Sequence, residues 1–350
     1  MATDLGDLRL LGGDIMFSRL YHYQHTCEMG RFAATVEESM ALLEVHGSGA
    51  ETSRTVGCSI VAYVCTGNFS QAQASRDRVL PLALASGDAG SLAHVELFGA
   101  MVDTAEGHFE QSRARSVKAV SIYRETGMPW VSAAMAASTG TAILLGDWET
   151  AETECRYAVD HAVDCPTFDG YEKSQLLYIR TLMGDERASE LLDEYEDLLP
   201  ELGRLNSLGS WHMLMSWIEC AALLKQHERA AKRYDSVLEF IAEQNVITYY
   251  PCLAQKIAGI AAYCGERYEE ASVHFDAAAR QAKELPFVSE QGEVRRWRAK
   301  MLLHRDAPGD RDAARGLLKE AITVYERYGM PKHVALAQSS LEASASMDSA

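Results

Sequence analysis

The residues with the clearest potential for chemistry lie near the N-terminus, in the string YHYQHTCE at 21–28. His22 and His25 are three positions apart and would share one face of a helix, and Glu28 or Cys27 could add a metal ligand. Zinc sites in proteins usually need three or four ligands held by supporting hydrogen bonds. Because half-exposed histidines and aromatics are common in a terminal helix, we interpret the string as packing at the end of the fold rather than as a metal site.

Basic side chains are densest in EVRRWRAKMLLHR at 293–305. At helical spacing the stretch forms a basic ridge and an apolar ridge, made by Arg296, Lys300 and His304 and by Val294, Trp297 and Met301. We favour a core ridge beside a solvated ridge. The alternative is a patch that binds an anion or an acidic partner.

The sequence lacks the common signatures of catalysis. It contains no GxxxxGK[ST] phosphate loop, no HExxH, no GxSxG and no calcium-loop spacing. The glycine-containing string HGSGAETSRTVG at 46–57 has no lysine, and we interpret it as a linker between two helix pairs. With no visible nucleophile–base pair or ligand cluster, we expect no enzymatic activity, no cofactor and no bound metal.

Charge and composition narrow the classes of partner. The chain has 350 residues with 50 acidic and 33 basic side chains, a net charge of −17, which disfavours direct binding of nucleic acid because that needs a basic face. The N-terminus has no secretory-signal layout, and no run approaches the roughly 18 apolar residues of a membrane span. The eight cysteines form no CxxC pair, as expected for reduced thiols. These features predict a cytoplasmic protein.

One short phrase recurs along the chain, as GRFAAT (30–35), GNFSQA (67–72), GHFEQS (107–112), GDWETA (146–151), ERYEEA (266–271) and GDRDAA (309–314). The small residues that end the copies are Thr35, Ala72, Ser112, Ala151, Ala230, Ala271 and Ala314, at intervals of 37, 40, 39, 79, 41 and 43. Because 79 is two intervals, the sequence predicts eight units of about 40 residues.

Each phrase lies between two apolar-periodic segments, such as 131–144 and 151–163, which predicts a pair of amphipathic helices. A glycine two residues before the aromatic can end the first helix in the left-handed conformation, and the aromatic fills the space between the helices. These predicted elbow residues are Gly30, Phe32, Gly67, Phe69, Gly107, Phe109, Gly146, Trp148 and Tyr268.

The glycine, aromatic and alanine spacing resembles the tetratricopeptide repeat. The units are longer than that family's, with His227 and Arg311 in two aromatic positions. The segments SIYRETGMPW (121–130) and TVYERYGMPKHVALAQ (323–338) are similar to the superhelical region of large bacterial signalling proteins, such as maltose-regulator-like activators and cyclases with a regulatory ATPase.

The resemblance implies an all-α, right-handed solenoid of about eight helical hairpins. We expect one domain over 1–345, with units ending near 50, 90, 129, 166, 206, 248, 289 and 332, a capping helix over 333–343, and a frayed tail at the C-terminus, disordered over 346–350.

In such solenoids the first helix of each unit lines the concave surface. Candidate ligand-facing residues are Gln24, Arg54, His94, Met101, Tyr171, Tyr178, His212, Met215, Lys256 and Arg296. Their mixture of aromatic, thioether and cationic groups suits a protein or peptide segment, or a small-molecule effector. We therefore expect a non-catalytic regulatory or scaffolding module. The alternatives are a ligand-sensing domain of a bacterial transcription regulator or nucleotide-cyclase system, and a groove whose residues only pack between units.

Overall fold

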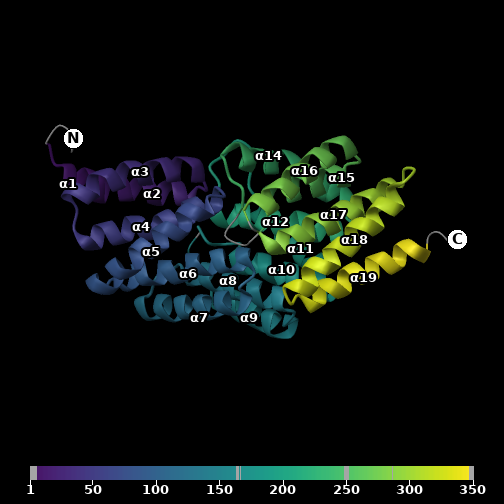
Figure 1. Ribbon diagram of the computed structural model, residues 1–350, viewed down its shortest axis with the longest axis horizontal. Coiled ribbons are helices and arrows are strands. Elements are labelled where there is room, and N and C mark those ends of the chain that lie inside the picture. The colour runs from purple at the N-terminus through teal and green to yellow at the C-terminus, as the bar shows by residue number, and fades with distance from the viewer. Residues whose placement is uncertain (1–5, 163–164, 166, 248–251, 286, 347–350) are drawn as a thin grey trace.

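The computed structural model describes residues 6–162, 165, 167–247, 252–285 and 287–346, most of which are helical (Figure 1). The first four helix pairs are α2 (Met16–His25) with α3 (Met29–His46), α4 (Gly49–Cys65) with α5 (Phe69–Ser86), α6 (Ala89–Glu106) with α7 (Phe109–Thr126), and α8 (Val131–Leu145) with α9 (Trp148–Asp160). Before them come a short helix α1 (Leu8–Leu10) and a π-helical turn, Leu11–Ile15.

The later pairs are α10 (Tyr171–Met183) with α11 (Ala188–Glu194), α12 (Leu208–Leu223) with α13 (His227–Ala231) and α14 (Tyr234–Ala242), α15 (Ala254–Cys264) with α16 (Tyr268–Glu284), and α17 (Val288–Arg305) with α18 (Asp310–Arg327). A 3-10 turn, Glu196–Leu198, follows α11, and α19 (Pro331–Ser346) ends the array. The described residues contain no strand beyond one isolated bridge between Ile247 and Leu253. The fold is an all-α solenoid.

The first helices of successive pairs contact one another and form a continuous inner layer, from α4 through α6, α8, α10, α12 and α15 to α17. Inner helices are buried around their whole circumference; every residue of α6 from Ala93 to Ala105 is buried. The outer helix α7 buries only one face, at a spacing of three and four residues from Phe109 to Tyr123. The inner layer is therefore covered on both sides, and the solenoid has no open concave surface along α6.

Left-handed residues end the first helix of every pair. They are Cys27, Gly67, Gly107, Gly146, Gly184, Lys225, Glu266 and Asp306, spaced by 40, 40, 39, 38, 41, 41 and 40 residues. This spacing is more regular than that of the small residues in the recurring phrase. The sharp turn, rather than the letters around it, is the feature that each unit must keep.

Two irregular intervals in the sequence now have a structural cause. The predicted elbow at Gly30 is wrong, because Gly30 lies inside α3 and the turn is made by Cys27, with φ of 61°. The copy at 30–35 therefore lies three residues later in its unit than the other copies do, and Phe32 rather than Thr35 matches Ala72. At the other end, Asp306 and Gly309 are both left-handed, and the longer turn accounts for the interval of 43.

Two predicted boundaries also differ. The stretch 46–57 is not a linker, because Ser48 caps α4 and exchanges hydrogen bonds with Glu51, so that the helix begins at Gly49. The last helix is longer than 333–343: it begins at Pro331 and extends to Ser346, into the predicted tail. Residues 347–350 lie outside the described part of the chain.

The solenoid closes on itself, because elbows of the early pairs contact connections between the late pairs. A Cβ atom added at Gly107 would lie 2.6 Å from Tyr328 Cδ1, and one at Gly146 would lie 2.9 Å from Pro331 Cγ. At a neighbouring elbow the rings of Phe69 and Phe287 are 6.3 Å apart. We call these contacts the closure interface; they also include α17 against α6 and α19 against α8.

Candidate ligand-binding interior

The predicted groove residues are buried inside the closed solenoid. Gln24, His94, Met101, Tyr171, Tyr178, His212, Met215, Lys256 and Arg296 each expose no more than 7% of their surface. The side chain of Arg54 lies outside the described part of the chain. The expected open groove is therefore a closed interior in this structure, and contact of these residues with a ligand stays a prediction.

Aromatic side chains fill the middle of the interior. The His94 ring centroid lies 5.3 Å from that of Trp130, and Tyr171 stacks on His212 at 4.3 Å. The ring nitrogen Nε2 of His212 lies 3.2 Å from Gln175 Nε2. Burial lowers the pKa of His94, and it lowers the pKa of His212 to about 3. Both imidazoles are therefore neutral near pH 7.

Charged side chains meet further along the same layer, and Glu219 of α12 is their centre. Its Oε1 accepts a hydrogen bond from Trp297 Nε1 at 2.9 Å, and its Oε2 lies 3.5 Å from Lys256 Nζ. The hydroxyl of Tyr178 donates to Oε1 at 3.4 Å, and Arg296 Nη2 lies 3.8 Å from it. One carboxylate therefore joins the inner helices α10, α12, α15 and α17.

Two more glutamates of α17 complete this ionic network, which we define as Glu219, Lys256, Glu290, Glu293 and Arg296. Glu290 Oε1 accepts from Lys256 Nζ at 2.8 Å. Glu293 forms a two-point pair with Arg296, at 3.0 Å from Nε and 2.5 Å from Nη2, and accepts from the Tyr325 hydroxyl at 2.6 Å. Three carboxyl groups thus face two cations, each less than 5% exposed.

The network perturbs the protonation of its members. Burial alone would lower the pKa of Lys256, but the adjacent Cys252 sulfur and the Glu219 and Glu290 carboxylates hold it well above its ordinary value. Burial raises the pKa of Glu290 to about 7, against the pull of Lys256. Burial would also raise the pKa of Glu293, but the Arg296 guanidinium holds it well below its ordinary value. Glu290 is thus the member that exchanges a proton near neutral pH.

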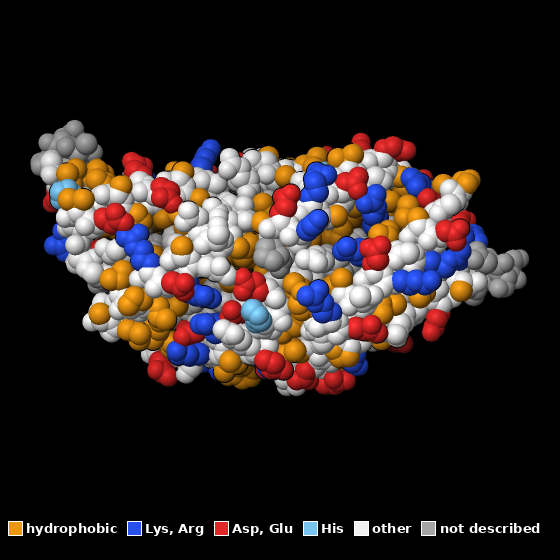
Figure 2. Space-filling view, in the orientation of Figure 1, with side chains coloured by type: hydrophobic (Ala, Val, Ile, Leu, Met, Phe, Trp, Pro, Cys, Tyr) orange, Lys and Arg blue, Asp and Glu red, His pale blue; other side chains and the backbone are white. Residues whose placement is uncertain are grey.

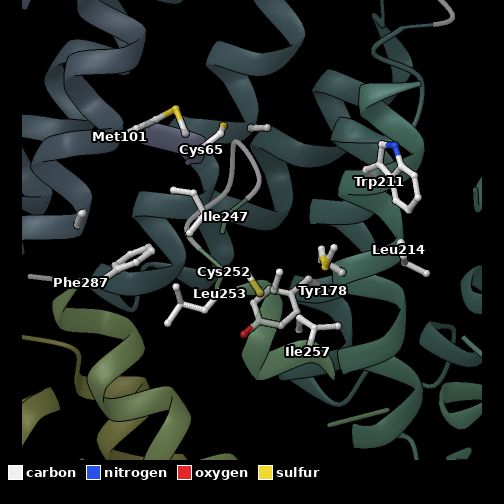
Figure 3. Close-up of a cluster of buried hydrophobic side chains, with 14 of the residues drawn as sticks. Cys65, Met101, Tyr178, Trp211, Leu214, Ile247, Cys252, Leu253, Ile257 and Phe287 are labelled. Carbon is white, nitrogen blue, oxygen red and sulfur yellow. The ribbon is translucent and has the colours of Figure 1, made fainter. Parts of the chain in front are cut away.

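The network also holds the backbone at the start of α15. Glu290 Oε2 accepts a hydrogen bond from the Leu253 amide at 3.0 Å, and Leu253 is bridged to Ile247. The amide of Val246 in turn donates to the Cys65 carbonyl at 2.8 Å. Figure 3 shows Ile247 below Cys65, and Leu253 beside the Tyr178 ring. Through Leu253 and its bridge to Ile247, the ionic network is therefore connected to the carbonyl of Cys65, just before the Gly67 elbow.

The basic ridge predicted at 293–305 divides in the structure. Val294, Trp297 and Met301 are buried, as the core ridge requires, but Arg296 is buried too and is not solvated. Its guanidinium is already paired with Glu293, so Arg296 is no free anion site. Sequence reasoning missed Glu219, Glu290 and Glu293; the available signal was a lone acid inside the apolar string WHMLMSWIECAAL (211–223).

The two histidines of YHYQHTCE, His22 and His25, have different neighbours. The His25 ring packs against Tyr21 and Phe168, at centroid distances of 4.5 and 6.1 Å, while His22 Nε2 lies 3.9 Å from Glu28. Among the described residues, the side chains spaced to hold an ion are those of Asp103, Glu106 and His108. Arg115 Nε already donates a hydrogen bond to the Asp103 carboxylate at 2.7 Å, so we do not assign a metal site to these three side chains.

Positive and negative side chains interleave on the face shown in Figure 2, including over the helices of the C-terminal half. No broad surface of one sign appears on that face. Among the described residues, no helix combines the length and the apolar character needed to cross a membrane.

No protein-family profile and no curated protein matches this chain. Among solved structures, it is similar to a Rap protein complexed with competence and sporulation factor, with a TM-score of 0.51 and 10% sequence identity. The match covers 95% of this chain and 97% of that chain. At this identity the likeness establishes the fold, a tetratricopeptide-like helical-repeat solenoid, over nearly the whole length.

Proposed function

We propose that this chain is a non-catalytic regulatory or scaffolding module that holds a protein segment or a small effector inside its solenoid. The ionic network carries the proposal. It gathers charged side chains from α12, α15 and α17 in a buried interior, where well-packed apolar residues would often be at least as stable. Stability alone therefore does not explain these buried charges. A charged group of a ligand can take the place of one network member and pair with the other, which an apolar interior does not allow.

The similar solved structure supports a binding role. The Rap protein is complexed with competence and sporulation factor, and its fold extends over the same length as this one. We carry over the idea of a bound factor only, and the nature of the ligand follows from this chain's own interior. Apolar and aromatic walls with a few charged groups suit a peptide segment or a compact effector.

Access to the interior requires the closure interface to open. The side-chain contacts that must separate include the Phe69–Phe287 ring pair and Lys332 Nζ, 5.2 Å over the Trp148 ring. A ligand that binds the open form better than the closed form shifts the population towards opening by its difference in affinity. The resulting change in superhelix shape is the signal that an attached partner would receive.

A second candidate is a ligand-sensing domain of a bacterial transcription regulator or cyclase system. The two segments that resemble such proteins share one local structure. The Met128 amide donates to Tyr123 O and the Met330 amide donates to Tyr325 O, at 3.0 and 2.9 Å. An ATPase, cyclase or DNA-binding domain in the same reading frame or an adjacent one would favour this candidate over a free-standing scaffold.

The test is a selection of displayed random peptides against the protein, followed by affinity measurement on two matched double variants. Lys256→Met with Glu290→Gln alters the interior, whereas Lys319→Met with Glu326→Gln makes the same changes on exposed positions of α18. We expect the interior variant to lose peptide affinity and the surface variant to keep it. Equal affinity for both variants, or a library that yields no binder, would refute the proposal.

A further inference from the structure

A cavity lies away from the ionic network, where the first helix pair meets the α12–α14 unit. It has a volume of about 430 Å³ and is lined by the turn after α2, the 203–206 loop, the start of α12 and the end of α14. Two left-handed residues turn the chain next to residues that line it: Cys27 after α2, and Gln244 after α14. We call it the junction cavity.

Asn245, which lines the cavity, has a buried acceptor without a partner. The side chain is 3% exposed, and its Nδ2 donates to the carbonyls of Cys27 and Phe240 at 2.9 and 3.0 Å. These two bonds fix the orientation of the amide. The Oδ1 atom then has no hydrogen-bond donor among the described residues. A buried acceptor left unpaired costs about 1–3 kcal/mol, which a ligand N–H would recover.

The remaining walls combine an aromatic floor with carboxylates. Trp211 is 6% exposed and packs on Phe240 at a ring distance of 5.5 Å. The carboxylate of Glu239 accepts the Gly203 amide at 3.1 Å. Glu243 is exposed at the rim of the cavity. Aromatic faces and carboxylates together are the groups that bind organic cations.

The cationic side chains of the cavity are already neutralised. Arg31 Nη1 lies 2.5 Å from Glu28, and Arg204 Nε lies 3.0 Å from Glu201. Each guanidinium thus already has a carboxylate partner, which weakens its attraction for an anionic ligand. The acceptors that remain are Asn245 Oδ1, which is enclosed in the cavity wall, and the Glu243 carboxylate, which is exposed at the rim.

We propose that the junction cavity binds a small organic cation, a protonated amine or guanidinium on a short apolar stem. The N–H donors bond to Asn245 Oδ1 and to the carboxylates of Glu239 and Glu243, while the stem lies on Trp211. Because the cavity joins the first unit to the α12–α14 unit, the cation stabilises the closed solenoid. This site is separate from the interior peptide site and does not depend on it.

Isothermal titration calorimetry of the full chain with agmatine and with spermidine tests the proposal, with inorganic phosphate as the anionic probe. We expect saturable binding of at least one cation and none of phosphate. Glu243→Gln, at an exposed position, should weaken cation binding by about tenfold, the loss expected for one charge-assisted hydrogen bond. Glu326→Gln, an exposed glutamate on α18, is the matched control and should bind as the unmodified chain does.

A second variant tests whether the loss of cation affinity comes from direct contact rather than from a change in net charge. Glu239→Gln keeps an oxygen for the Gly203 amide and should also weaken cation binding, with unchanged helical circular dichroism. Phosphate binding, no binding of either cation, or equal affinity in Glu243→Gln and Glu326→Gln would overturn the proposal. Peptide selection against Glu243→Gln should give the same binders as before, so that failure at this cavity is distinguishable from failure of the interior site.

Discussion

Removal of the Lys256 ammonium tests whether the ionic network is buried and coupled as described. In Lys256→Met, Glu290 loses a partner at 2.8 Å and Glu219 loses one at 3.5 Å. Glu219 keeps the hydrogen bond from Trp297 Nε1, whereas Glu290 keeps the one from the Leu253 amide. Breaking one partner of a buried pair typically costs about 3–5 kcal/mol. We expect a loss of this size in the free energy of unfolding at pH 8.

The loss should grow with pH, and the sign follows from Glu290. Its pKa in the fold is raised to about 7 from an ordinary 4.5, so it contributes stability that is lost as pH rises through this window. In the unmodified chain the loss of folding stability ends near pH 7, because the Lys256 ammonium lets the Glu290 carboxyl ionise there. Without Lys256 the carboxyl stays protonated to higher pH, so the gap between the proteins widens by up to about 1.4 kcal/mol per pH unit above 7.

Urea unfolding followed by tryptophan fluorescence between pH 6 and 9 measures this gap, since Trp297 donates directly to Glu219. Lys256→Met combined with Glu290→Gln should recover most of the stability and remove the widening, because Gln still accepts the Leu253 amide. Lys319→Met on α18 controls for the loss of a charge at an exposed position. A Lys256→Met variant as stable as this control, or a gap that does not change with pH, would refute the description of the network.

Three further outcomes are expected. Gly107→Ala should destabilise the chain by about 1–3 kcal/mol more than Gly127→Ala, and should enlarge the radius of gyration in X-ray scattering, because both glycines are left-handed but only Gly107 abuts Tyr328. Equal effects would mean that the closure interface is open in solution. Lys225→Gly, at an exposed left-handed elbow, should raise the free energy of unfolding by up to about 1 kcal/mol, a gain that urea titration would detect. His212→Phe should flatten the loss of stability below pH 6.5 by about 1.4 kcal/mol per pH unit, because a buried imidazole with pKa about 3 stays neutral while the unfolded chain takes up a proton. An unchanged pH profile would contradict that protonation state.

The repeat could be predicted from sequence because it is a local property. A helix of about 15 apolar-periodic residues, a sharp turn and a second helix are specified by neighbours within one unit, as at Gly146 and Trp148. Errors arose where different residue types meet the same local demand. Cys27 takes the left-handed turn without being glycine, and the glycine-containing string 46–57 begins a helix because Ser48 and Glu51 cap it.

The sequence by itself determined an all-helical array with a period of about 40 residues, and the family resemblance implied which helix of each pair faces inward. Only the tertiary structure decided that the inward face is closed, that Glu219 meets Lys256 and Arg296, and that Asn245 reaches Cys27. The physical reason is the range of the interactions. Helix pairs form from contacts within a unit, whereas closure sums small rotations over eight units, and no local pattern records where that sum brings the chain back onto itself.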